Sequence, residues 1–94
     1  MRISRKRVIE ICNCLSNDKL KYELIVHQNL GNRKDYYYTY SIATYEKINY
    51  YESHDGSIIG GEWKHKETVI NDTSLKQAYD YICKELEKEV ESFK

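Results

Sequence analysis

The sequence predicts an α+β protein in which an antiparallel sheet of three to four strands carries an N-terminal and a C-terminal helix on one face, in the order α-β-β-β-β-α. Three observations support this class. Apolar residues recur every three to four positions near both ends, they alternate with polar residues in the middle, and turn-forming residues divide that middle region. The chain has 94 residues, the size of one domain, so residues 1–94 are expected to share one core.

Both predicted helices have a candidate cap and an apolar stripe. Ser4 can cap a first helix that extends to about Leu15. Asp72, Thr73 or Ser74 can cap the last helix, and Ser74 with Gln77 matches a capping box. The last helix has the longest stripe, over five turns: Leu75, Tyr79, Ile82, Leu86, Val90 and Phe93.

The middle of the chain predicts four strands: residues 20–26, 36–44, 46–53 and 63–70. A loop over residues 29–35 joins the first two strands, and Asp55-Gly56 is a typical hairpin turn after the third. No Gly or Pro marks the boundary between the second and third strands. Gly60-Gly61 is expected to interrupt the pattern before the fourth.

Alternation along these strands assigns their side chains to two faces. The helix-covered face is expected to hold Leu24, Val26, Tyr38, Tyr40, Ile42, Ile48, Tyr50 and Val69. The opposite face is expected to show Tyr37, Thr39, Lys47, Tyr51, Lys64 and Lys66. A rigid uncovered face that mixes tyrosine with lysine suits binding better than catalysis. The candidate partner-binding residues are therefore Tyr37, Tyr51, Lys47, Lys64 and Lys66.

Motifs of enzymes and metal sites are missing from the sequence. It contains no phosphate-binding loop, nucleophile elbow, zinc-protease motif or calcium-binding loop. The three cysteines are an odd number with no disulfide-framework spacing, and we expect reduced, mostly buried thiols. We therefore expect no catalytic residues, no metal and no cofactor.

The leading functional hypothesis is a protein-binding domain that inhibits a host protein. Ten tyrosines, four glycines and no proline accompany many lysines, asparagines and isoleucines, a usage typical of AT-rich genomes such as low-GC bacteria and their phages. In size and composition the chain resembles the small phage-encoded inhibitors of host defence, such as the anti-CRISPR proteins. That resemblance implies a host protein as the partner.

The alternative hypothesis is a small nucleic-acid-binding regulator. Its candidate phosphate contacts are the basic residues at the N-terminus: Arg2, Arg5, Lys6 and Arg7. The order of helix, antiparallel strands and helix is similar to that of the double-stranded RNA-binding domain. That family grips phosphates with a lysine cluster at the start of its second helix, where this chain has only Lys76. Equal numbers of basic and acidic residues, 15 each, weigh against a dedicated nucleic-acid domain.

No segment indicates a membrane protein. The longest apolar stretches are a few residues, far below the roughly 20 that span a bilayer. The apolar core of a signal peptide does not follow the basic N-terminus. We therefore expect a cytoplasmic protein without a membrane partner. The sequence does not predict an oligomeric state.

Overall fold

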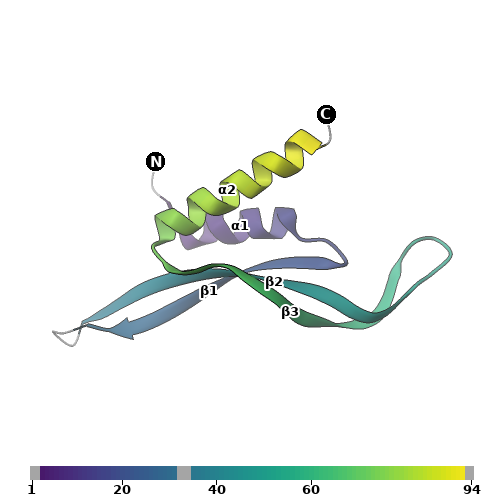
Figure 1. Ribbon diagram of the computed structural model, residues 1–94, viewed down its shortest axis with the longest axis horizontal. Coiled ribbons are helices and arrows are strands. Elements are labelled where there is room, and N and C mark those ends of the chain that lie inside the picture. Colours follow the sequence, from purple (N-terminus) through teal and green to yellow (C-terminus); the bar gives the residue numbers. More distant parts are fainter. Residues whose placement is uncertain (1–2, 32–34, 93–94) are drawn as a thin grey trace.

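A computed structural model describes residues 3–31 and 35–92 of the chain. Its elements are α1 (Arg5–Leu15), β1 (Leu20–Leu30), β2 (Tyr36–Glu52), β3 (Ile58–Thr73) and α2 (Leu75–Ser92). Both helices lie on the same face of the sheet (Figure 1). The predicted α+β class, with a helix at each end of the chain, is confirmed.

The strands form one antiparallel sheet with the order β1-β2-β3. The described residues contain three strands, because the second and third predicted strands are one strand of 17 residues. No turn-forming residue interrupts the chain there, so extended backbone continues through residues 44–46. The prediction that Gly60-Gly61 interrupts the pattern before the last strand was also wrong, since β3 passes through both glycines. The predicted turn at Asp55-Gly56 is confirmed.

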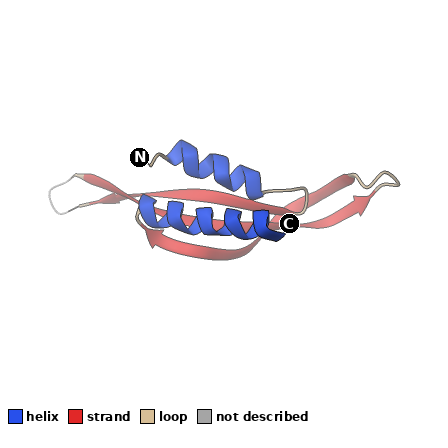
Figure 2. Cartoon of the chain, turned by 90° about the horizontal axis from the view of Figure 1, so that it is seen from above, coloured by secondary structure: helices blue, strands red, loops and turns tan. Residues whose placement is uncertain are grey.

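The sheet is much longer than the helices that cover it. At about 1.5 Å per residue, α1 and α2 span roughly 16 and 27 Å, whereas β2 spans roughly 56 Å at about 3.3 Å per residue. The molecule measures 58 × 32 × 19 Å. Two hairpins therefore project beyond the helices (Figure 2). We call them the β1–β2 arm (residues 27–30 and 36–39) and the β2–β3 arm (residues 47–52 and 58–63).

The core lies between the helices and the centre of the sheet. Its buried residues come from α1, β2 and α2: Val8, Ile11, Cys12, Leu15, Tyr40, Ile42, Ala78 and Ile82. Leu24 packs against this cluster as predicted. Val26 and Tyr38, which we expected in the core, are 40% and 45% exposed, because they lie near the β1–β2 arm, where helix coverage ends. Ile48 and Tyr50 are half-buried but lie outside the core cluster, and Phe93 falls outside the described residues.

Both predicted helix caps are confirmed. The Oγ atom of Ser4 accepts a hydrogen bond from the Arg7 N–H. At the start of α2, the Gln77 N–H donates to Ser74 Oγ, and the Ser74 N–H donates to Gln77 Oε1. Each of these bonds satisfies a backbone donor that the helix itself leaves free.

The two strand pairings differ in regularity. The β1–β2 register is unbroken from Leu20–Glu46 to Leu30–Tyr36. The β2–β3 register shifts at three places between Tyr40 and Tyr45, each shift adding a residue on the β3 side. Such bulges bend a strand and re-aim its backbone groups. The outer edge of β3 is consequently irregular, while that of β1 is regular.

Candidate functional site

The face of the sheet that the helices leave uncovered carries a group of aromatic and lysine side chains, which we call the Trp63 cluster. Its members come from all three strands: Lys21, Tyr45, Lys47, Trp63 and His65. Lys21 lies opposite Tyr45, Tyr45 opposite His65, and Lys47 opposite Trp63. Residues paired across antiparallel strands share a face, so the register brings these five side chains together.

Contacts within the cluster orient its side chains. The Nζ atom of Lys47 lies 5.1 Å from the centroid of the Trp63 ring, and Nζ of Lys21 lies 6.0 Å from the same ring. Lys21 is also 5.9 Å from the Tyr45 ring. Tyr45 and His65 meet edge to face, with centroids 5.6 Å apart and an interplanar angle of 79°. Cation–π and aromatic contacts of this kind contribute about 0.5–1 kcal/mol each at exposed sites, enough to favour one arrangement.

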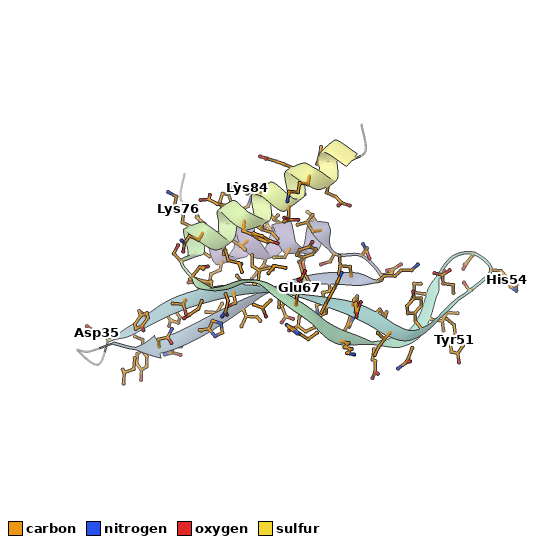
Figure 3. The ribbon with its side chains drawn as sticks, in the orientation of Figure 1. Asp35, Tyr51, His54, Glu67, Lys76 and Lys84 are labelled. Atoms are coloured by element: carbon orange, nitrogen blue, oxygen red, sulfur yellow. The ribbon has the colours of Figure 1, made fainter. Side chains whose placement is uncertain are left out.

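The cluster is accessible from outside. Trp63, the only tryptophan of the chain, is 38% exposed, His65 is exposed, and the other three members are half-buried. The described helices lie on the opposite side of the sheet, and many side chains project from this face without an element over them (Figure 3). A partner can therefore reach rings and ammonium groups that are already oriented, which reduces the entropy lost on binding.

Ser41 is the buried centre of a hydrogen-bond network on the same face. It is 1% exposed, and its Oγ atom lies 2.9 Å from His27 Nε2, donates to Asn71 Oδ1 at 3.0 Å and accepts from the Asp72 N–H at 3.0 Å. A hydroxyl has one hydrogen, which goes to Asn71, so His27 Nε2 must be a donor. A buried serine facing a histidine donor is not an activated nucleophile. The network instead ties β1 and the bulged part of β3 to β2.

A cleft of about 260 Å³ lies between α1 and β1. Ile9, Cys12 and Asn13 of α1 line it together with residues 21–24. Burial raises the pKa of the Cys12 thiol to about 11. The thiol is therefore protonated near neutral pH and is a poor nucleophile. Cys12 therefore does not supply the cleft with a reactive nucleophile.

The five predicted partner-binding residues do not form one patch. Lys47 belongs to the Trp63 cluster. Tyr37 and Tyr51 are 52% and 77% exposed, but they lie on β2 fourteen residues apart, one in each arm. Figure 3 shows Tyr51 near the end of the β2–β3 arm. Lys64 lies opposite Glu46, so alternation places it on the other face from Trp63, and Lys66 is exposed near a register shift.

Four members of the cluster were missed by sequence reasoning: Lys21, Tyr45, Trp63 and His65. Their common signal is alternation, because positions 21, 45, 47, 63 and 65 are all odd-numbered strand positions. Only the pairing register shows that they meet, and the sequence does not give that register.

The basic N-terminal residues lie at the start of α1, on the helix-bearing side of the sheet. Arg5 Nε donates to the Tyr40 hydroxyl at 3.0 Å, and its guanidinium stacks 4.4 Å from the Tyr38 ring centroid. This hydrogen bond to Tyr40 raises the pKa of Arg5. Arg7 pairs with Glu10 at 3.4 Å, and Lys6 is exposed. Arg2 lies outside the described residues.

Within residues 3–31 and 35–92, no three His, Cys, Asp or Glu side chains gather where they could hold a metal ion. Cys12 is buried, Cys83 half-buried and Cys14 exposed, and all three are free thiols. Neither of the two described helices combines the length and the apolar character needed to cross a bilayer.

Comparison of the chain with protein-family models, with curated proteins and with solved structures gave no significant match in any of the three.

Proposed function

We propose that this chain is a non-enzymatic protein-binding domain and that the Trp63 cluster is the centre of its contact surface. The observation that carries the proposal is the gathering of the only tryptophan with Tyr45, His65 and two lysines on an uncovered sheet face. Tryptophan and tyrosine are the residues most enriched among those that dominate binding energy at protein interfaces. A rigid sheet presents them in a fixed arrangement.

The partner surface is expected to be acidic around an apolar centre. Lys21 and Lys47 hold ammonium groups over the ring of the partly exposed Trp63, where carboxylates of a partner can pair with them. Charge complementarity of this kind accelerates association and fixes the orientation of the two proteins. The indole N–H of Trp63 offers a further donor.

The inhibitor hypothesis is the narrower form of this proposal. Small size and AT-rich residue usage support a phage- or mobile-element-encoded chain that blocks a host protein, with anti-CRISPR proteins as the example. The absence of a reactive group at Ser41 and at Cys12 fits a protein that acts by occupying a surface.

Nucleic acid remains the second candidate partner, through exposed Lys6 and the neighbouring arginines. Three observations favour the protein partner instead. The net charge is zero, Arg5 and Arg7 already have partners within the chain, and two ammonium groups lie over the Trp63 ring on which a base would stack.

The test is capture from a low-GC bacterial lysate after nuclease treatment, followed by titration of the identified partner. We expect one protein to be retained by the wild type and lost with Trp63→Ala, with an affinity loss of about 30-fold or more, equivalent to about 2 kcal/mol. Trp63 fluorescence reports the same event directly, because the chain has one tryptophan. Tyr36→Ala, which removes a 64% exposed aromatic ring on the helix-bearing face of β2, is the matched control and should retain the partner.

Salt dependence separates the two candidate partners. If nucleic acid binds through the N-terminus, replacing Lys6 and Arg7 by Ala should flatten the plot of log affinity against log salt by nearly two. For a protein partner at the Trp63 cluster, these replacements should have little effect. Tight, salt-sensitive binding of generic DNA or RNA that survives Trp63→Ala would contradict our proposal.

A further inference from the structure

The edge of β1 has hydrogen-bonding groups that the chain itself leaves open. In an antiparallel pair, the N–H and C=O of one residue point to the same side, and successive residues alternate. The Lys19 carbonyl accepts from the Lys47 N–H of β2, and the Tyr22 N–H points the other way, to Ser16 Oγ. Even-numbered residues of β1 therefore point their backbone groups away from β2.

The connection from α1 covers only the first part of this edge. Asn17 binds both backbone groups of Leu20, and Ser16 binds the N–H of Tyr22. Further along, the outward groups of Leu24, Val26 and Gln28 have no hydrogen-bond partner among the residues that the structure describes. Six donors and acceptors thus lie in a row on a strand without bulges.

The two edges of the sheet are protected to different degrees. The three register shifts of β3 make its edge irregular, which is a common protection against pairing with another chain. Residues 24–30 of β1 have no bulge, no charged Lys, Arg, Asp or Glu, and no proline. Val26 and Leu30, on the helix-bearing face, are 40% and 63% exposed. The unprotected edge and the exposed apolar side chains coincide.

We infer that a second copy of this chain pairs with this edge, β1 against β1, about a two-fold axis at Val26. An edge joins itself only if it is self-complementary. A two-fold axis at Val26 places Leu24 opposite Gln28 of the partner copy and Val26 opposite its own equivalent, so all three open residues of both copies are used. Tyr22 then faces Leu30, Ile25 faces His27, and no like charges are opposed.

The lack of Lys, Arg, Asp and Glu in residues 24–30 also favours a second copy of this chain as the partner strand. A strand added here meets Leu24, Val26 and Leu30 on one face and Ile25 on the other, so it needs uncharged residues at the same alternation. Residues 24–30 of another copy meet that need and are present wherever the chain is made. The product is a six-stranded sheet in which helices from both copies share one face.

In this dimer the helix-free faces of the two copies lie side by side. They form one surface that carries two Trp63 clusters. This inference does not depend on the proposed function, since the dimer forms or fails through Val26 whether or not Trp63 binds a partner. The two proposals are tested by different variants and different readouts.

The experiment is sedimentation of the full chain over a range of concentrations. We expect the wild type to form two-chain particles. Val26→Lys and Val26→Glu should each sediment as one chain, because each sets like charges opposite one another at the axis. An equimolar mixture of the two variants should restore the dimer, because Lys then faces Glu, and this restoration also shows that both variants are folded. Ile59→Lys, which charges an apolar residue of β3 that is even more exposed than Val26 (56% against 40%), should remain dimeric.

Amide exchange gives an independent readout. In the wild-type dimer, the N–H groups of Leu24, Val26 and Gln28 should be protected, and in Val26→Lys they should exchange quickly while those of Ile25 and His27 stay protected. A wild type that sediments as one chain at every concentration overturns the inference, whether the edge stays open or takes a strand of another protein. A Val26→Lys variant that remains dimeric, or a mixture that stays monomeric, overturns the assignment of the interface to β1.

Discussion

The centre of the molecule and its two arms are built from the same strands but are stabilised differently. At the centre, Val8, Ile42 and Ile82 are fully buried between the helices and the sheet. In the arms, Tyr51 and Leu30 are 77% and 63% exposed, and cross-strand pairs replace a core. Stability therefore resides in the centre, while the largest exposed side chains lie in the arms. Exposed side chains of the arms can therefore change with little effect on folding.

The strongest test of this contrast compares Ile82→Ala with Ile59→Ala. Ile82 is fully buried on α2, so its truncation should lower the free energy of unfolding by about 2–5 kcal/mol. Ile59 is 56% exposed in the β2–β3 arm, and its truncation should cost less than about 0.5 kcal/mol. Urea denaturation followed by circular dichroism measures both. Similar losses of unfolding free energy for the two variants would mean that Ile59 contributes to stability as much as a core residue does.

Two neighbouring glycines sharpen the comparison within the β2–β3 arm. Gly61 has φ +90°, and an added Cβ would lie 2.9 Å from the Ile48 carbonyl oxygen and 2.9 Å from Tyr50 Cβ. Gly60 has φ +70° with open space around it. We expect Gly60→Ala to cost about 1 kcal/mol from backbone conformation alone. Gly61→Ala should cost more than Gly60→Ala, because steric overlap adds to the strain.

Amide exchange in residues 47–52 is the measurement for these glycine variants. Both variants should speed exchange in the arm and leave the amides of Ile42 and Ala43 unchanged, since local opening limits the damage. Faster exchange at the centre of β2 would show that the arm and the core unfold together. Equal effects of the two substitutions would show that the close approach at Gly61 does not matter.

The smallest expected effect is a pH dependence confined to the end of the β2–β3 arm. Hydrogen bonds from the Ser53 hydroxyl and the Ser57 N–H lower the pKa of Asp55 from 3.8 to about 2. A lowered pKa in the folded state contributes stability above the unfolded pKa, and that contribution is lost as pH falls through the folded value. The turn should therefore loosen between about pH 4 and pH 2. The Ser57 amide shift in NMR spectra should report this change, and it should be absent in Asp55→Asn.

Local sequence signals predicted most of the elements. Ser4, Ser74 and Gln77 marked the helix starts because capping depends on residues within one turn. Asp55-Gly56 marked its hairpin for the same reason. The boundary proposed within β2 was wrong because no local signal existed there. The interpretation of the sequence was also wrong where burial depends on residues far away in the chain. Tyr38 was expected in the core but is exposed, because the helices do not extend far enough to cover it.

The candidate site depended even more on distant residues. Trp63, Tyr45 and Lys21 are on three strands, and their meeting requires a register that three bulges shift. Alternation in the sequence divides the side chains of each strand between two faces, but it does not show how one strand is aligned with the next. Lys47 was recovered because its position relative to the uncovered face follows from β2 alone. Lys64 was placed on the wrong face because the alternation along β3 was not aligned with the alternation along β2.

The unequal lengths of sheet and helices have a consequence for how the protein can adapt. Each arm is a ladder of cross-strand pairs with no helix over it, so its length is not set by the core. Inserting or deleting two successive pairs changes the reach of an arm by about 6.8 Å and returns every remaining side chain to its original face. The span between the two hairpin ends is therefore adjustable in steps. A lineage of such chains could match partners of different size while keeping the same helices and the same centre.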